Sequence, residues 1–204
     1  MRWFDFLFPP RVDEIVLRNV SDDDFFALVK PRIVPETRPG TVVLFPFNDP
    51  RVRSAIHEAK YHGSVRAFRL LGFALADYLR DADDVGPRRS HIVPVPLGKG
   101  RLKERGYNQA EEIARQALRS LDEHFSLNIN LLERVKETKT QVSLERRSRE
   151  ENMRGAFKAA RHIDPSHTYI VIDDVITTGA TLQSAIDALK GAGAEHIITL
   201  ALAH

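Results

Sequence analysis

The sequence predicts an α/β fold in which a mostly parallel sheet is covered by helices on both faces. Residues 169–172 form an uninterrupted apolar run and residues 197–202 are almost as apolar, as expected for strands buried inside a sheet. Between them, apolar residues recur at three- and four-residue intervals, the pattern of a helix packed on a sheet: Leu182, Ala185, Ile186 and Leu189. Strands that alternate with helices build parallel sheets enclosed between helical layers.

Residues 51–121 repeat this alternation. The spacing of apolar residues predicts a helix that ends near residue 80, with Gly63 separating it from a shorter helix before it: Val65, Phe68, Leu71, Leu75 and Leu79. Residues 91–95 form a short β-branched run bounded by prolines, which predicts a strand. A further helix is predicted for 108–121, where four apolar residues share one face: Ala110, Ile113, Ala117 and Leu121.

Residues 1–50 are predicted to form a small amino-terminal appendage to a domain that spans 51–204. They are rich in proline and contain only short apolar runs such as 41–47, which indicates strands and turns.

The composition indicates a soluble globular domain of ordinary size. Of the 204 residues, 43% are hydrophobic and 28% are charged. No stretch approaches the roughly 20 apolar residues of a membrane span, and no small-residue cleavage site of a signal peptide follows the opening residues. Cysteine is absent, which excludes disulfides and thiolate metal sites. We therefore expect a cytoplasmic protein.

Charge is unevenly distributed along the chain. Residues 1–50 carry six Lys or Arg against eight Asp or Glu, a net charge of −2. Because the whole chain carries +2, residues 51–204 carry +4. This surplus would attract an anionic ligand or a nucleic acid backbone, while a solvated surface of mixed charge is the alternative.

The most informative pattern lies in residues 169–182, which read YIVIDDVITTGATL. The apolar strand runs into two adjacent carboxylates, Asp173 and Asp174, and the carboxyl ends of parallel strands border the ligand crevice. Small and hydroxylated residues around a glycine then start a helix: Thr177, Thr178, Gly179, Ala180 and Thr181. The backbone N–H groups and the dipole of such a helix start favour a bound phosphate, and the hydroxyl groups add donors.

Together these two halves predict a site for a ribose 5-phosphate group. The carboxylates of Asp173 and Asp174 can accept hydrogen bonds from sugar hydroxyls, while the phosphate, one sugar-length away, meets the threonine-glycine loop. The alternative is structural, with the acids in a turn and Thr177 or Thr178 capping the helix. Either half alone favours that alternative, whereas the full pattern favours the ligand site.

The combined motif resembles the phosphoribosyl pyrophosphate signature of type I phosphoribosyltransferases. The resemblance implies the type I phosphoribosyltransferase fold, catalytic roles for Asp173 and Asp174, and a Mg²⁺-assisted displacement of pyrophosphate from C1 of the ribose. Mg²⁺ would be held mainly by pyrophosphate and water rather than by a protein cage, with Asp173 as a candidate protein contact.

Three further segments resemble one branch of these proteins, the ComF family, which is linked to DNA uptake in competent bacteria. They are residues 58–63 (EAKYHG), residues 93–110 (VPVPLGKGRLKERGYNQA) and residues 141–157, which end in NMRGAF. The resemblance covers about residues 51–204.

The same resemblance implies a four-cysteine zinc module within the first 50 residues, after a Leu-Phe-Pro-Pro-Arg stretch. Residues 7–11 match that stretch, but Val12 follows and the chain contains no cysteine. A thiolate zinc finger is therefore excluded, and the appendage is interpreted as a degenerate form of this module.

Cations follow the predicted strand at 91–95 and indicate a pyrophosphate site at the same sheet edge as the acid pair. They lie on a loop with several glycines: Lys99, Arg101, Lys103 and Arg105. In phosphoribosyltransferases the corresponding loop holds pyrophosphate, and the resemblance places that role here on five residues: Val95, Pro96, Leu97, Arg101 and Arg105. The alternative is that these cations are merely solvated.

Residues 133–158 are predicted to form a basic, flexible hood. They carry eight Lys or Arg against five Asp or Glu and lack a long apolar face. By resemblance, the hood closes over the reacting centre, and Arg147 or Arg154 neutralises charge on the departing pyrophosphate. An exposed, salt-bridged helix is the alternative. Lys60 is also expected near the site, although a helix C-terminus alone favours a cation there.

Three functions remain open: phosphoribosyl transfer to a nitrogen nucleophile, single-stranded DNA binding as an accessory of DNA uptake, and sensing of phosphoribosyl pyrophosphate without turnover. Only Tyr107 qualifies as an aromatic for stacking on bases among the cations. The eight histidines lack convincing metal-ligand spacing, so no histidine metal site is predicted. The expected partners are phosphoribosyl pyrophosphate or a similar ribosyl phosphate, single-stranded DNA and, in a homodimer, a second copy of the chain.

Overall fold

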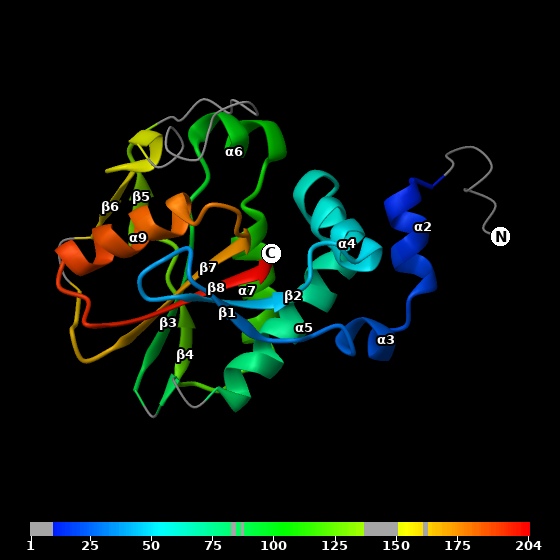
Figure 1. The fold of residues 1–204 in the computed structure, drawn as a ribbon, viewed down its shortest axis with the longest axis horizontal. Coiled ribbons are helices and arrows are strands. Elements are labelled where there is room, and N and C mark those ends of the chain that lie inside the picture. Colours follow the sequence, from blue (N-terminus) through cyan, green and yellow to red (C-terminus); the bar gives the residue numbers. More distant parts are fainter. Residues whose placement is uncertain (1–9, 83–84, 87, 137–150, 161–162) are drawn as a thin grey trace.

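The computed structural model describes residues 10–82, 85–86, 88–136, 151–160 and 163–204, and it has the predicted α/β architecture (Figure 1). Its main sheet has the strand order β1-β2-β8-β7-β3-β4. The strands span Arg32–Val34 (β1), Thr41–Phe45 (β2), Ser90–Pro94 (β3), Phe125–Leu127 (β4), Thr168–Val175 (β7) and His196–Ala203 (β8). Neighbouring strands are parallel except for β1, which pairs with β2 in the antiparallel direction at one edge.

Helices cover both faces of the sheet, as predicted. One face packs against α4 (Pro50–Tyr61), α5 (Val65–Asp81) and α7 (Gln109–Leu118), and the other packs against α9 (Ala180–Gly191). Two short helices, α2 (Val12–Asn19) and α3 (Asp22–Phe26), extend the first layer at one end of the molecule (Figure 1). The site residues described below lie where these two layers meet the carboxyl edge of the sheet.

The central strand β7 contributes side chains to both hydrophobic cores. Ile170 and Ile172 belong to the core beneath α4, α5 and α7, whereas Tyr169 and Val171 belong to the core beneath α9. This division follows from the geometry of a strand, in which successive side chains point to opposite faces. The same alternation decides where the acids at the end of β7 lie.

Local signals in the sequence account for the helix boundaries. Asp49 caps α4 by accepting a hydrogen bond from the Arg51 N–H, and Asn108 caps α7 by accepting from the Ala110 N–H. Gly63, with a φ of +57°, separates α4 from α5 as predicted, because this left-handed conformation suits glycine and interrupts a helix.

The boundary predicted between residues 50 and 51 does not separate two structural units. Strand β2 lies inside the main sheet, where it pairs with β8, and β1 extends the edge. The prediction was wrong because the apolar run at 41–47 indicates a strand but not its partner, which lies more than 150 residues further along the chain.

The predicted loop of cations is partly helical. Helix α6 (Lys99–Arg105) begins after Gly98, its N-cap, and ends at Gly106, which adopts the left-handed conformation of a helix C-cap with a φ of +78°. Two of the glycines that indicated a loop therefore flank a short helix, and the third, Gly100, lies in its first turn.

The ends of the predicted hood are anchored to the fold. Strands β5 (Leu132–Arg134) and β6 (Phe157–Ala159) form a two-stranded antiparallel sheet that packs near α9. Met153 and Phe157 are buried in the core beneath α9, and the Ser184 hydroxyl donates a hydrogen bond to the Met153 carbonyl at 2.6 Å. Residues 137–150 lie outside the described part of the chain.

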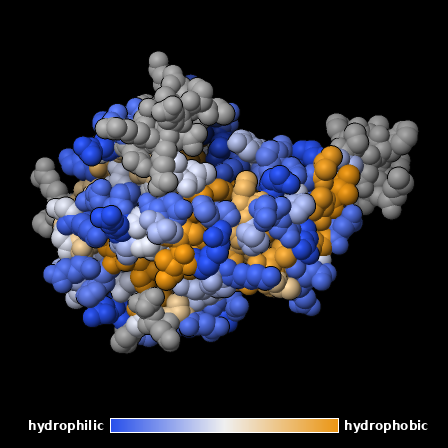
Figure 2. All heavy atoms as spheres, viewed as in Figure 1, coloured by the Kyte–Doolittle hydropathy of each residue, from blue (hydrophilic) through white to orange (hydrophobic). Residues whose placement is uncertain are grey.

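The visible surface is mostly hydrophilic (Figure 2). Hydrophobic side chains gather over α2, where Val12 and Ile15 are 78% and 42% exposed. Among the helices of the described residues, none combines the length and apolar character that crossing a bilayer requires.

Candidate functional site

Two predicted site segments lie side by side at the carboxyl edge of the sheet. Strands β3 and β7 pair in parallel with Pro94 opposite Ile172, so the loop that starts at Val95 begins beside Asp173. The Val95 N–H donates a hydrogen bond to the Ile172 carbonyl at 2.9 Å. Pro96 and Leu97 are half-buried in this loop, while the Val95 side chain is buried in the core beneath α9.

Strand β7 continues through both acids, which places the two carboxylates on opposite faces of the sheet. Asp173 follows the alternation of Tyr169 and Val171 and lies on the α9 side, where it is half-buried in a pocket. Asp174 follows Ile170 and Ile172, lies on the side of α4 and α7, and is only 5% exposed. The acid pair therefore has one member at a pocket and one within the protein.

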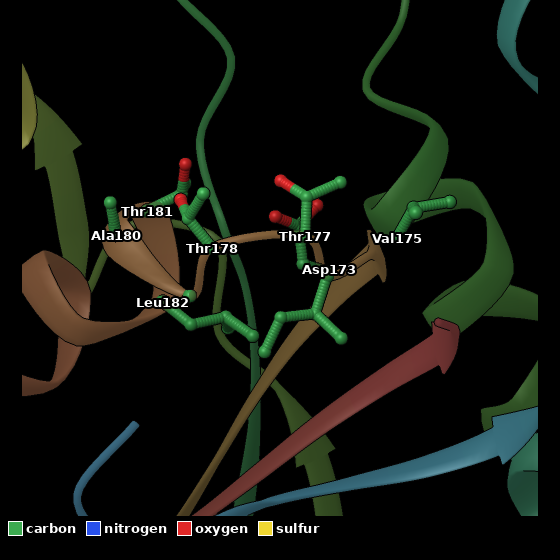
Figure 3. Close-up of a pocket in the computed structure, with 9 residues that line it drawn as sticks. Asp173, Val175, Thr177, Thr178, Ala180, Thr181 and Leu182 are labelled. Atoms are coloured by element: carbon green, nitrogen blue, oxygen red, sulfur yellow. The ribbon is translucent and has the colours of Figure 1, made fainter. Parts of the chain in front are cut away.

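The pocket beside Asp173 is formed by the predicted phosphate loop (Figure 3). Its lining includes Thr177, Thr178, Gly179, Ala180 and Thr181. The cavity volume of this pocket is about 30 Å³, far less than the roughly 300–1,000 Å³ of a site for a drug-sized ligand. The loop thus forms a small recess at the surface and does not enclose a base.

The threonines of this loop do not cap α9. Its N-cap residue is Gly179, with a φ of +74°, and no side chain accepts a hydrogen bond from the first turn. The structure therefore does not support the alternative in which Thr177 or Thr178 caps the helix. A helix start without a side-chain cap can offer its N–H groups and its dipole to an anion.

Gly179 also meets a steric requirement that the sequence did not reveal. A Cβ atom at this position would lie 2.5 Å from the carbonyl oxygen of Glu36, in the connection between β1 and β2. The positive φ and this close approach both require glycine. The connection between β1 and β2 thus packs directly against the loop at Gly179.

Asp174 is held by two side chains from the helical layer. Lys60 Nζ of α4 lies 3.2 Å from Asp174 Oδ2, and Gln109 Nε2 of α7 donates a hydrogen bond to the same oxygen at 2.7 Å. Burying a carboxylate is costly unless it is paired and hydrogen-bonded, and these contacts meet both needs. Lys60 was expected near the site, whereas sequence reasoning missed Gln109.

Asp173 has a strongly perturbed acidity. Burial raises the pKa of Asp173 from 3.8 to about 7, and repulsion from the Asp174 carboxylate adds to the shift. The hydrogen bond that Asp173 Oδ1 accepts from the Asp174 N–H, at 2.8 Å, and the positive charges of Lys60 and Arg134 oppose it. Perturbed carboxyl groups of this kind are typical of functional sites.

The predicted pyrophosphate cations have different environments. Arg105 Nη1 donates a hydrogen bond to Gln109 Oε1 at 2.9 Å, and its guanidinium lies 4.9 Å from the centre of the Tyr61 ring. Arg101 is half-buried on α6. Arg105 is thus linked, through Gln109, to the buried member of the acid pair.

The hood cations are only partly described. Arg147 lies outside the described residues, and Arg154 is exposed, with its carbonyl accepting a hydrogen bond from Lys136 Nζ at 2.8 Å. Among the described residues of this segment, the charge of Arg134, at the end of β5, acts on Asp173. The local pattern of the hood does not single out Arg134 for this role.

Tyr107 does not have the exposure that base stacking would need. Its hydroxyl donates a hydrogen bond to the Ala59 carbonyl and accepts one from the Gly63 N–H, both at 2.8 Å, and its ring packs edge-on against Phe68. Tyr61, which is 54% exposed, is the aromatic residue that lies beside Arg105 at the surface.

Two histidines whose spacing within a helix did not indicate a metal site lie close together in the structure. His57, Glu58 and His62 bring potential ligand atoms within 4.8 Å of one another, because the chain leaves the helix at His62. Arg11, however, donates hydrogen bonds to both oxygens of Glu58 at 2.9 and 2.8 Å, and His57 Nδ1 lies 2.9 Å from Asp13 Oδ2. These contacts explain the cluster as part of the packing of α2 and the residue before it against α4.

Comparison with known proteins relates the chain to one family. Residues 103–204, half of the chain, match the model of the phosphoribosyl transferase domain. Competence protein F of Haemophilus influenzae is 39% identical over 137 residues, which are 66% of this chain and 58% of that protein.

Two further relatives carry related names. Competence protein ComFC of Bacillus subtilis is 28% identical over 74% of this chain and 58% of its own length, and DNA utilization protein YhgH of Escherichia coli is 33% identical over 50% and 44%. The chain thus spans 44 to 58% of the length of these three relatives.

Proposed function

The chain belongs to the phosphoribosyl transferase domain family, in its ComF branch, and we propose that it binds phosphoribosyl pyrophosphate, or another ribose 5-phosphate ligand, together with Mg²⁺. The observation that carries this proposal is the pocket in which the Asp173 carboxylate and the uncapped start of α9 face the same space. A carboxylate accepts from sugar hydroxyls, and a helix start attracts a phosphate.

Each part of the site has a role in this proposal. The Thr177–Thr181 loop takes the 5-phosphate, and Asp173 accepts hydrogen bonds from the ribose hydroxyls. Arg101 and Arg105 of α6, with Arg134 of β5, provide positive charge for the pyrophosphate at the adjacent sheet edge.

Mg²⁺ suits the chemistry of these donors. Asp173 offers the oxygen ligand that this ion prefers, and the pyrophosphate would supply most of the remaining ligands with water. When bound, the ion neutralises charge on the pyrophosphate leaving group. The ionised form of Asp173 is the one that can act as a ligand, so ion binding is expected to strengthen as pH rises past about 7.

The reaction that this arrangement favours is transfer of the phosphoribosyl group to a nitrogen nucleophile. The lone pair of the nitrogen forms a bond to C1 of the ribose while the C1–O bond breaks, and pyrophosphate leaves with the electron pair. The protein's contribution is to align the two groups and stabilise the developing charge. Where binding occurs without this reaction, the site would act as a sensor of phosphoribosyl pyrophosphate.

Calorimetry with phosphoribosyl pyrophosphate and Mg²⁺ tests the binding proposal. Asp173→Asn removes a charged acceptor worth about 1.5–3 kcal/mol, which corresponds to a roughly 10- to 150-fold loss of affinity. Asp187→Asn on the exposed side of α9 is the matched control and should bind as the wild type does. Wild-type protein that produces no heat of binding would refute the proposal.

Release of pyrophosphate in the presence of ammonia or glutamine tests turnover separately. Release that depends on both the nucleophile and Asp173 supports transfer. Retained binding without release supports the sensor role.

A second candidate function is binding of single-stranded DNA, which the names of the relatives suggest: two are competence proteins and one is a DNA utilization protein. In this chain the supporting observation is exposed Tyr61 beside Arg105, because a ring next to a cation is a stacking position for a base. Tyr61→Ala should weaken binding of a labelled oligonucleotide, and the wild-type affinity should fall steeply with salt. Wild-type protein without measurable affinity at low salt would exclude this function.

A further inference from the structure

Gln109 connects the two halves of the proposed site. It lies in the first turn of α7, is 3% exposed, and has a partner at each end of its amide. Its Oε1 accepts from Arg105 Nη1 at 2.9 Å, and its Nε2 donates to Asp174 Oδ2 at 2.7 Å. The proposed function does not assign this residue a role.

The two partners of Gln109 fix the orientation of its amide. A guanidinium group can only donate and a carboxylate can only accept, so the amide must present its oxygen to Arg105 and its nitrogen to Asp174. Turning the amide over would replace both hydrogen bonds with unfavourable contacts in a buried place. The position of Arg105 and the position of Asp174 are therefore linked through one rigid group.

One end of this connection lies at the proposed pyrophosphate subsite, and the other is the strand neighbour of the phosphate pocket. Arg105 is the last residue of α6, which follows the proposed pyrophosphate loop, while Asp174 is the strand neighbour of Asp173 at the phosphate pocket. Lys60 contacts the same Asp174 oxygen from α4, a helix outside the pyrophosphate loop, so it holds the acid without belonging to the connection between the two subsites.

We propose that Gln109 is a positioning residue that couples the two subsites, so that pyrophosphate held at Arg105 strengthens the binding of ribose 5-phosphate beside Asp173. This inference rests on the proposed function. Arg105 has five N–H donors and can keep its bond to Gln109 while it binds a phosphate oxygen. Fixing Arg105 also fixes Gln109 and Asp174, which lowers the entropy cost of ordering the site for the second ligand.

The test compares the affinity for ribose 5-phosphate, by calorimetry, with and without saturating magnesium pyrophosphate. The ratio of the two affinities is expected to be at least about fivefold larger in the wild type than in Gln109→Met, which keeps the side-chain length but has no amide. Direct repulsion between the two anions affects both proteins alike and cancels in this comparison. Equal ratios would overturn the inference.

Two further variants separate coupling from a general loss of structure. Gln116→Met, also on α7 but packed beside Gly72, should keep the wild-type ratio. Lys60→Met should weaken ribose 5-phosphate binding while leaving the ratio unchanged, and a ratio that fell as far as in Gln109→Met would overturn the proposed path.

The outcomes distinguish this inference from the proposed function. Wild-type protein that binds neither ligand overturns the proposed function and the coupling together, whereas binding without coupling overturns only the coupling. Should Gln109→Met fail to fold, Gln109→Asn replaces it, because its shorter amide cannot reach both partners and the same loss of coupling is expected.

Discussion

Replacing Asp173 with asparagine should stabilise the protein at alkaline pH. The raised pKa of Asp173, about 7 against 3.8 for an unperturbed group, means that the folded state holds this proton more tightly than the unfolded state does. Wild-type stability therefore falls as pH rises from about 4 to about 7, because ionisation is disfavoured only in the folded protein. Asparagine resembles the protonated form and does not ionise, so its advantage grows with pH.

The size of the effect follows from the pH interval. Between pH 5 and the folded pKa of about 7 lie two pKa units, worth at most about 2.7 kcal/mol at roughly 1.36 kcal/mol each. Asp173 is partly exposed, and solvent screening reduces this limit, so the gain from Asp173→Asn should be about 1–2 kcal/mol larger at pH 8 than at pH 5. For a chain of 204 residues this corresponds to roughly 2–8 °C in the difference of melting temperatures.

Thermal and urea unfolding at both pH values measure this difference. Asp187→Asn, at an exposed position of α9, should change stability by less than about 0.5 kcal/mol at either pH. An Asp173→Asn variant whose gain is the same at pH 5 and pH 8, or smaller at pH 8, would refute the reasoning that the fold resists ionisation of this carboxyl group.

Two other substitutions test contacts around the site. Lys60→Met leaves buried Asp174 with Gln109 but without its cation, and should lower the free energy of unfolding by about 1–3 kcal/mol in urea titrations; an unchanged midpoint would argue against the ion pair. Gly179→Ala places a Cβ 2.5 Å from the Glu36 carbonyl at a positive φ and should cost about 1–3 kcal/mol, whereas Gly191→Ala, with open space around it, should be nearly neutral. Equal melting temperatures for these two alanine variants would contradict the steric argument.

The sequence predicted elements that have strong local patterns. The apolar run at the start of β7 and the helical spacing in α5 and α9 lie entirely within each element, so each could be predicted without knowing its tertiary partners. The joint position of Asp173 and the phosphate loop was also accessible, because both belong to one continuous segment. The expectation that Asp174 also faces the ligand was wrong, because alternation along β7 turns it to the opposite face.

Contacts between distant segments could not be predicted in the same way. The apolar run at 41–47 indicates a strand but not its pairing with β8, and the partners of Asp174 come from α4 and α7, more than 60 residues away. The sequence shows that Lys60 and Gln109 are polar, but only the packing of two helices against β7 shows that both reach one carboxylate oxygen. The effect of the Arg134 charge on Asp173 could not be predicted either, because it also depends on how distant segments pack together.

Neighbouring residues of an extended strand cannot serve the same side of a sheet, so the two aspartates of β7 are not interchangeable despite their identical chemistry. Their amide variants should change the free energy of unfolding in opposite directions. Neutralising Asp173 removes a carboxyl group whose ionisation the fold disfavours, whereas neutralising Asp174 leaves Lys60 without its ion-pair partner. A deletion of one residue within β7 ahead of the acids would exchange their faces, so that Asp174 would turn to the pocket side, away from Lys60, and Asp173 would turn toward the helical layer of α4 and α7. The register of this strand therefore determines which of the two acids faces the binding site.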